Sequence, residues 1–235
     1  PGPLTIVFPK KDIVPMATSG GLRTIAIRCP AHEAARALIR AAGVPIAGPS
    51  ANISTKPSPT TADAVLHDMD GRIEFVIDGG DSLIGLESTV IAVENGKIII
   101  YRPGGITRDM LEVFAPTELD TAITAEQEHP KAPGMKYRHY APKGQLTLVE
   151  GDKDKVIAKI NELVREKKEE GYKVGVIGTD ETLDAYHADI LRSIGSRQKP
   201  ESVAANLYRI LREFDDLECD YMYSESFFEQ GLGNA

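Results

Sequence analysis

The chain has 235 residues, of which 42% are hydrophobic and 26% are charged. These values are ordinary for a globular protein, and no apolar run approaches the roughly 20 residues that span a bilayer, so a disordered or membrane-spanning chain is excluded. Cys29 and Cys219 are far apart and lack CxxC spacing, which argues against a zinc site and a secreted disulfide framework. We therefore expect a reduced, cytoplasmic protein with no membrane segment.

The net charge of -8 is unevenly distributed along the chain. Residues 1–118 carry 11 basic and 13 acidic side chains, whereas residues 146–235 carry 12 basic and 19 acidic ones. Because binding to nucleic-acid phosphates requires a basic surface, the last third is a poor candidate for such an interface. Any site for a polyanion is expected in residues 1–145.

The first half of the chain has the apolar spacing of alternating strands and helices. The predicted strands are Leu4–Phe8, Thr24–Arg28, Val44–Ala47, Phe75–Asp78, Thr89–Val93 and Lys97–Arg102. The predicted helices are Ala31–Ala42, a helix that begins at Thr60 or Thr61 and runs to about His67, and Thr107–Phe114. Thr24–Arg28 is expected to be a buried strand, and Asn95-Gly96 is typical of a hairpin turn.

Residues 119–145 form a predicted linker, because prolines and glycines replace the periodic apolar residues. Strands and helices then alternate as in a parallel sheet flanked by helices. The predicted elements are strand Leu146–Val149, helix Asp152–Glu170, strand Lys173–Ile177, a helix near Leu183, strand Ile190–Leu191, a helix from Pro200 to about Phe214, and strand Tyr221–Tyr223. The expected organisation is a first domain over residues 1–118, the linker, and a parallel α/β domain over residues 146–235.

Three polar loops of the first domain are candidates for ligand binding. Residues 48–61 place hydroxyls, one amide and one lysine before a helix, where free N–H groups can hold phosphate or carboxylate oxygens. Ser88 and Thr89 stand at the start of a strand, and Arg102 precedes a Pro-Gly-Gly turn with a planar fork that suits phosphate. For residues 48–61, the pattern alone favours an ordinary capping turn over a ligand site. For Ser88-Thr89 an ordinary turn, and for Arg102 a surface arginine, fits the pattern as well as a ligand site does.

A fourth segment, residues 134–142, includes two tyrosines, two cations and His139 within five positions. A solvated linker would be rich in Ser, Glu, Gln and Lys, so we favour contact with a nucleotide over packing of the tyrosines on a domain face. The chain has no supportable Ser–His–Asp, HExxH or paired-carboxylate motif. No catalytic side chain and no metal ligand is therefore predicted.

In this order, the segments resemble the two-domain threonylcarbamoyl-AMP synthases, in which a YrdC-like domain precedes a C-terminal domain. The resemblance extends over essentially the whole chain. It is carried by Pro1–Thr5, Thr24–Arg28, Pro49–Asn52, Ser58–Thr60, Gly85–Val90, Arg102–Gly104 and Tyr137–Pro142. It implies a twisted α/β catalytic domain, incomplete at its N-terminus, and a smaller Rossmann-like parallel α/β domain.

The resemblance implies a nucleotidyltransferase that converts L-threonine, bicarbonate and ATP into threonylcarbamoyl-AMP and pyrophosphate. The threonine amine captures carbon dioxide, and an oxygen of the carbamate attacks the α-phosphate of ATP. Positioning and charge stabilisation by Arg, hydroxyls and Mg²⁺ suffice for this transfer, which needs no nucleophile–base pair. A tRNA-modifying transferase complex would use the product on the adenosine beside the anticodon of ANN-reading tRNAs, while direct tRNA binding by this chain stays open.

The resemblance also assigns site residues. ATP is expected to contact Thr24, Ser50, Asn52, Ser58, Arg102, His139 and Tyr140. L-Threonine is expected to contact Arg28 through its carboxylate, together with Gly48 and Ser88, and Asn52 could reach either substrate. Thr55 stands where the family usually has a small glycine, which affects the geometry of that turn. The family's first part, which grips the triphosphate, has no counterpart here, so we expect this chain alone to be inactive.

Other functions compete with the synthase. A carbamoyl-adenylate-forming enzyme of the hydrogenase-maturation type would accept carbamoyl phosphate in place of threonine, but the C-terminal domain and the linker motif oppose it. An RNA-binding module would use the concave YrdC-like face, which the acidic balance of residues 1–118 opposes. Residues 146–235 lack the GxGxxG spacing of a dinucleotide site, so a scaffold, a lid or a binding surface for a partner or effector is expected there.

Overall fold

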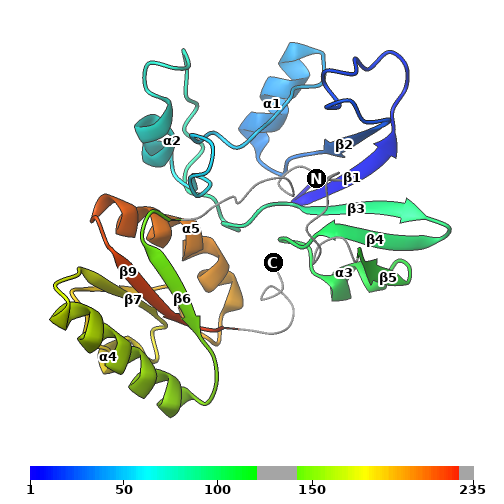
Figure 1. The fold of residues 1–235 in the computed structure, drawn as a ribbon. Helices are drawn as coiled ribbons and strands as arrows, with labels where there is room; N and C mark the ends of the chain where they lie inside the picture. The colour runs from blue at the N-terminus through cyan, green and yellow to red at the C-terminus, as the bar shows by residue number, and fades with distance from the viewer. Residues whose placement is uncertain (121–141, 228–235) are drawn as a thin grey trace. The chain divides into compact units, whose positions relative to one another are not determined.

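A computed structural model describes residues 1–120 and 142–227 (Figure 1). Contacts divide these residues into two compact units. The first unit contains residues 1–49 and 86–120, and the second contains residues 50–85 and 142–227. Residues 50–85 therefore belong structurally with the C-terminal part of the chain, and the boundaries at residues 118 and 146 stay a prediction. His139 and Tyr140 lie outside the described residues.

The first unit is built on a mixed five-stranded sheet with the order β2-β1-β3-β4-β5. Its strands are β1 (Leu4–Pro9), β2 (Thr24–Arg28), β3 (Thr89–Glu94), β4 (Lys97–Arg102) and β5 (Thr117–Leu119). β1 runs antiparallel to β2 and parallel to β3, and β3 turns into antiparallel β4 at Asn95-Gly96. Both turn residues have positive φ, as a tight hairpin turn requires. The α/β class is confirmed.

Two helices accompany this sheet, α1 (Glu33–Ala42) and α3 (Arg108–Glu112). The Thr107 side chain caps α3 by accepting a hydrogen bond from the backbone of Met110, and Leu111 packs against the isoleucines of β3 and β4. Two expectations for this region are wrong. β2 is an edge strand with Ile27 53% exposed, not a buried strand, and Val44–Ala47 is not a strand. An apolar run does not reveal whether a partner strand is available on each side.

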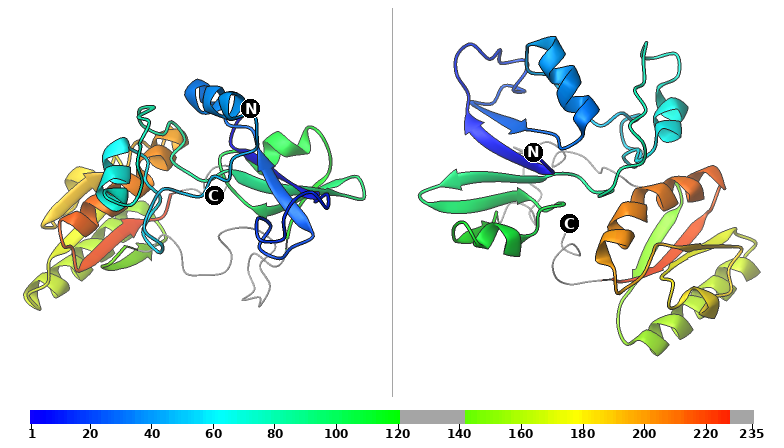
Figure 2. Two further views of the ribbon diagram at one scale, coloured as in Figure 1. Left: turned by 90° about the horizontal axis from the view of Figure 1, so that it is seen from above. Right: turned by 180° about the vertical axis from the view of Figure 1, so that it is seen from behind.

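The second unit contains a four-stranded, fully parallel sheet with the order β6-β9-β7-β8. The strands are β6 (Gln145–Val149), β7 (Val174–Gly178), β8 (Ile190–Ser193) and β9 (Tyr221–Glu225). The helices are α2 (Ala62–Met69), α4 (Lys153–Glu169), the short 3₁₀ helix η2 (Leu183–Ala185) and α5 (Pro200–Asp216). Figure 2 shows α4 and α5 on opposite faces of the sheet, which is the expected Rossmann-like layering.

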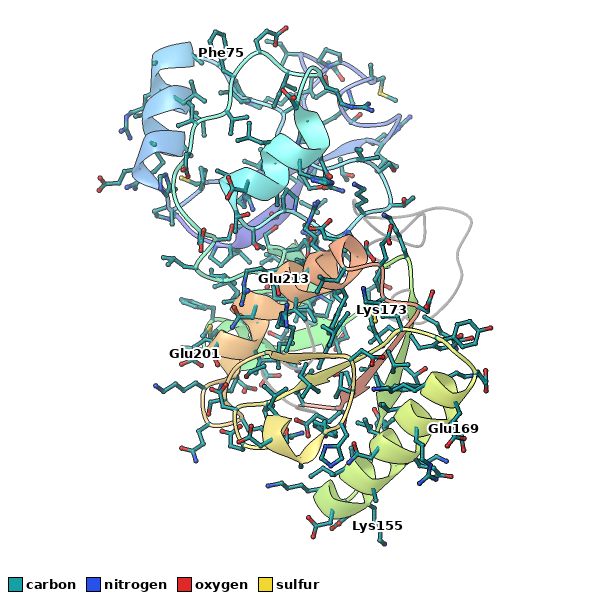
Figure 3. The ribbon with its side chains drawn as sticks, turned by 90° about the vertical axis from the view of Figure 1, so that its left-hand side faces the viewer. Phe75, Lys155, Glu169, Lys173, Glu201 and Glu213 are labelled. Atoms are coloured by element: carbon teal, nitrogen blue, oxygen red, sulfur yellow. The ribbon has the colours of Figure 1, made fainter. Side chains whose placement is uncertain are left out.

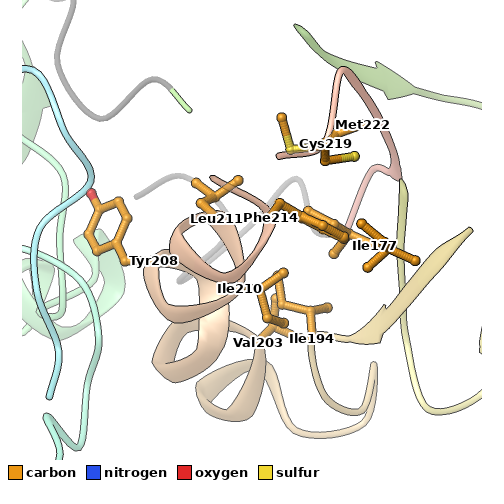
Figure 4. Close-up of a cluster of buried hydrophobic side chains, with 10 residues drawn as sticks. Ile177, Ile194, Val203, Tyr208, Ile210, Leu211, Phe214, Cys219 and Met222 are labelled. Carbon is orange, nitrogen blue, oxygen red and sulfur yellow. The ribbon is translucent and has the colours of Figure 1, made fainter. Parts of the chain in front are cut away.

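The alternation of side chains along the central strands explains this layering. Val174 and Val176 of β7 face α4, whereas Ile177 joins Phe214 of α5 and Met222 of β9 in a separate core (Figure 4). The predicted strand Phe75–Asp78 is absent, since residues 75–78 have no strand partner and Phe75 is 88% exposed (Figure 3). None of the helices in the described ranges is long and apolar enough to cross a membrane.

Candidate functional site

Three predicted site residues gather at one end of the sheet in the first unit. Arg28 ends β2, Ser88 immediately precedes β3, and Arg102 ends β4. Thr5 of β1 connects them, because it pairs with Arg28 on one side and with Val90 on the other. Strand direction causes this gathering, since the C-terminal ends of β2 and β4 meet the N-terminal ends of β1 and β3.

Hydrogen bonds from side chains to other side chains and to the backbone hold Thr5, Ser88 and Arg102 in one geometry. The hydroxyls of Thr5 and Ser88 lie 2.7 Å apart. The Arg102 guanidinium donates to the Ser88 carbonyl through Nε at 3.1 Å and Nη2 at 2.9 Å, and Nη2 also lies 3.1 Å from Ser88 Oγ. The acceptors in these three bonds are neutral, and Ser88 is only 5% exposed. A guanidinium held in one orientation by such bonds is suited to an anionic ligand.

The neighbours of Ser88 have structural roles. The Thr89 hydroxyl is fully buried, donates to the carbonyl of Ile106 at 2.6 Å and accepts from its N–H at 2.9 Å. Gly104 packs so closely that a Cβ atom there would come within 3.0 Å of backbone atoms of Glu87, Ser88 and Thr89. The Pro-Gly-Gly turn therefore requires glycine at this position because it rests on the backbone of Ser88.

We predict that Gly104→Ala lowers the free energy of unfolding by about 2 kcal/mol, because overpacking against backbone cannot be relieved by a side-chain rotation. The displaced Ser88 backbone should also weaken substrate binding. Gly2→Ala is the matched control, since a Cβ atom at Gly2 would meet nothing within 4 Å. Denaturant unfolding compares the two variants, and equal midpoints would contradict this account.

Two other predicted residues of the first unit lie apart from this cluster. Thr24 pairs with Pro9 at the opposite end of β2, four positions along the strand from Arg28. At the usual rise of a strand this is about 13 Å. Gly48 is exposed, with space around its Cα. The roles of Thr24 and Gly48 stay predictions.

The predicted residues Ser50, Asn52 and Ser58 belong to the second unit. Ser50 is exposed and Ser58 is buried. The amide nitrogen of Asn52 donates to the carbonyls of Ile53 at 2.9 Å and Lys56 at 3.1 Å. Its Oδ1 is buried and has no hydrogen-bond partner among the described residues. The Asn52 amide nitrogen therefore stabilises its own loop, and Oδ1 can accept a hydrogen bond from a ligand.

The backbone at Thr55 has a conformation that favours glycine. Thr55 has a φ of 82°, in the left-handed region that β-branched residues avoid. We expect Thr55→Gly to raise the free energy of unfolding by about 1 kcal/mol, because the strain exceeds the extra chain entropy of glycine. Thermal unfolding at neutral pH measures this gain. Ser54→Gly is the control, because Ser54 has no positive φ and the glycine should lower the free energy of unfolding. If Thr55→Gly lowered it by the same amount, Thr55 would not be strained.

The sequence analysis missed an ionic network that anchors this loop. The Asp68 side chain on α2 is fully buried and accepts hydrogen bonds from Ile53 N at 3.3 Å, Lys56 Nζ at 3.0 Å and Arg212 Nη2 at 2.7 Å. Burial raises the pKa of Asp68, but the hydrogen bonds from Arg212 and Lys56 outweigh this effect and hold the pKa at about 2. No spacing in the sequence connects Asp68 with a residue 144 positions later.

At the carboxyl ends of the parallel strands, the buried side chain of Glu225 is fully hydrogen-bonded within the protein. Glu225 is 1% exposed and accepts from Thr179 N at 3.0 Å, Thr182 Oγ1 at 2.6 Å and Arg197 at 2.9 Å. In open α/β sheets, ligands usually bind at the carboxyl ends of two neighbouring strands whose following connections lead to opposite sides of the sheet. Here β7 and β9 are joined by a satisfied carboxylate, so Glu225 has a structural role.

The remaining features of the described residues do not coincide with the predicted site. A pocket beside α2 is lined mainly by Leu66, Met69, Ile73 and Phe75, and none of the predicted residues lines it. In the described ranges no three His, Cys, Asp or Glu side chains come together as a metal site would require.

The mixed sheet with its Ser88–Arg102 cluster and the parallel α/β unit define a two-part α/β protein with a polar, cationic strand end. A family model described as "Telomere recombination" matches residues 1–104, and one described as "Threonylcarbamoyl-AMP synthase, C-terminal domain" matches residues 106–235. The chain therefore belongs to the Sua5 family of threonylcarbamoyl-AMP synthases.

Similar proteins agree with this assignment. Threonylcarbamoyl-AMP synthases of Bacillus subtilis and Pyrococcus abyssi are 45% and 47% identical, and the matches cover all of this chain and 67% and 68% of those proteins. The crystal structure of P. abyssi Sua5 complexed with L-threonine matches with a TM-score of 0.92 and 46% identity, over all of this chain and 68% of that one. A variant of the same protein, with alanine replacing an adjacent histidine and tyrosine, matches with a TM-score of 0.93.

Proposed function

We propose that this chain belongs to an enzyme that makes threonylcarbamoyl-AMP and pyrophosphate from L-threonine, bicarbonate and ATP. Two relatives are named threonylcarbamoyl-AMP synthase, and the P. abyssi relative has been crystallised with L-threonine. The observation that supports the proposal most is the cluster of Thr5, Ser88 and Arg102. The first two residues present hydroxyls and the third a fixed cation, as expected for two small polar substrates of which one carries phosphates.

The chemistry requires little beyond positioning. Threonine's amine takes up carbon dioxide, the carbamate oxygen bonds to the α-phosphorus of ATP, and the bond to pyrophosphate breaks. Arg102 stabilises the negative charge on the phosphate oxygens, and Arg28 binds the carboxylate of threonine. Thr24, Ser50 and Ser58 contact the nucleotide, and Gly48 and Ser88 contact threonine.

Asn52 has a narrower role than the sequence suggested. Its amide nitrogen is used within the loop, so only Oδ1 is available, and an acceptor cannot bind a phosphate oxygen. We infer that Oδ1 accepts from an adenine amino group, a ribose hydroxyl or the ammonium of threonine. Mg²⁺ would enter with the triphosphate, since it usually keeps several waters and needs only one or two protein ligands.

The tyrosine-rich linker segment completes the proposal. His139-Tyr140 is the only His-Tyr pair in the sequence, and an adjacent histidine and tyrosine were chosen for substitution in the P. abyssi relative. We assign His139 and Tyr140 to contacts with the bound nucleotide. A tRNA-modifying transferase complex in the cytoplasm would use the product, and the inactivity of residues 1–235 alone stays a prediction.

Omission of single substrates tests the proposal against its alternatives. In the full-length protein, pyrophosphate release should require threonine, bicarbonate and ATP together. Release with carbamoyl phosphate in place of threonine would favour the carbamoyl-adenylate enzyme. A salt-dependent affinity for RNA without any turnover would favour the RNA-binding module.

A further inference from the structure

Helix α5 has buried side chains on two different faces. Ile210 and Phe214 pack against the parallel sheet of the second unit. Ala204, Tyr208 and Arg212 are spaced four residues apart, so they share another face of the helix. Figure 4 shows Tyr208 pointing away from the other labelled side chains, toward the loop drawn in cyan. This second face meets residues 50–85, whose helix α2 lies beside α5 in Figures 2 and 3.

Contacts at both ends hold residues 57–85 against this face. The Arg212 guanidinium donates to the Pro57 carbonyl through Nε at 3.0 Å and Nη2 at 2.7 Å, and Nη2 also donates to Asp68 at 2.7 Å. At the other end, a Cβ atom on Gly85 would lie 2.5 Å from the carbonyl oxygen of Ala204. The Arg212 side chain is 11% exposed and that of Asp68 is fully buried, so water does not compete for these bonds.

The contacts of Arg212 extend to the polar loop through Asp68. The same carboxylate accepts from Ile53 N and Lys56 Nζ, and the carbonyls of Ile53 and Lys56 accept from Asn52. Pro57, the other acceptor for Arg212, directly precedes Ser58. Arg212 thus contacts residues 52–58 directly at Pro57 and, through Asp68, at Ile53 and Lys56. This stretch carries two of the predicted ATP contacts, Asn52 and Ser58.

We infer that Arg212 is a positioning residue for the ATP-binding loop, and that holding residues 52–58 is a function of the C-terminal part of the chain. The inference rests on the proposed function for its ATP-specific part. A guanidinium suits this position because its planar fork reaches a carbonyl and a carboxylate at once, which a lysine ammonium cannot match. Loss of the fork should release the loop while the core on the opposite face of α5 stays intact.

The test compares Arg212→Met and Arg212→Lys with Arg209→Met in the full-length protein. Arg209 is a matched control because it lies one turn away on α5, and it donates hydrogen bonds to Glu213 and Asn206 of the same helix. Hydrogen exchange of peptides over residues 52–58 should be at least tenfold faster in Arg212→Met, with a clearly smaller change in α4. The KM for ATP should rise about tenfold while the KM for threonine stays within twofold. In both the exchange rate and the KM for ATP, Arg212→Lys should lie between the wild type and Arg212→Met, and Arg209→Met should match the wild type.

Unchanged exchange over residues 52–58 would overturn the inference. So would an acceleration of the same size in α4 and residues 52–58 with an equal rise in both KM values, because Arg212 would then act only on global stability. If the wild-type protein makes no threonylcarbamoyl-AMP, the proposed function fails. The exchange comparison, which needs no activity, still decides whether Arg212 holds the loop.

Discussion

Arg102→Met should lower kcat/KM of the full-length enzyme by roughly 100- to 1000-fold, the usual loss when a preorganised donor to a developing negative charge is removed. The reason is specific to this site. Arg102 is held by three hydrogen bonds to Ser88, so its charge stays in place without reorganisation during the reaction. Steady-state pyrophosphate release measures the loss.

Arg108→Met is the control for this effect. Arg108 lies in the same unit but pairs with Glu112 on the exposed side of α3, so kcat/KM should change less than threefold. If Arg102→Met had no larger effect than Arg108→Met, the strand-end cluster would not be the phosphate site, and Arg102 would only support the backbone of Ser88.

Asp68→Asn should lower the free energy of unfolding by about 3 kcal/mol, because removal of one charge from a buried ion pair leaves its partners uncompensated. Lys56 and Arg212 would both face a neutral amide in place of a carboxylate. Asp70→Asn is the control, since Asp70 is exposed at the end of the same helix and should change stability by less than about 0.5 kcal/mol. Equal denaturation midpoints for the two variants would contradict the network.

The same carboxylate predicts a pH dependence. The pKa of Asp68 falls from 3.8 to about 2 on folding, because hydrogen bonds from Arg212 and Lys56 outweigh burial. A depressed pKa stabilises the folded state above pH 4 by about 2 kcal/mol, and this contribution is lost as the pH falls toward 2. The difference in stability between wild type and Asp68→Asn should therefore shrink between pH 4 and pH 2. A constant difference over this range would show that Asp68 does not titrate as the network requires.

Local sequence signals predicted much of the secondary structure. Thr61 caps α2, Asn95-Gly96 turns β3 into β4, and the alternation after residue 145 marks a parallel sheet. These features depend on residues within a few positions of one another, where propensity and capping operate. The short strand β5 and the edge position of β2 escaped prediction because both depend on which strands are neighbours.

The candidate site was predictable in part. The resemblance selected Arg28, Ser88 and Arg102, which the sheet brings to one end, but it gave no indication that Thr5 joins them through its hydroxyl. Asp68 and Arg212 carry no motif, and a buried ion pair across 144 residues leaves no periodic trace in a single sequence. Contacts between residues so far apart in the sequence can be found only in the folded structure.

The central claim is that the chain serves the synthesis of threonylcarbamoyl-AMP, and the reaction product tests it most directly. The full-length protein would be incubated with ATP, L-threonine and ¹³C-bicarbonate, and the nucleotides would be analysed by mass spectrometry. The account predicts an adenylate that contains threonine and one ¹³C atom, formed in equal amount with pyrophosphate. ATP cleavage without this labelled adenylate, or an adenylate that lacks threonine, would contradict it.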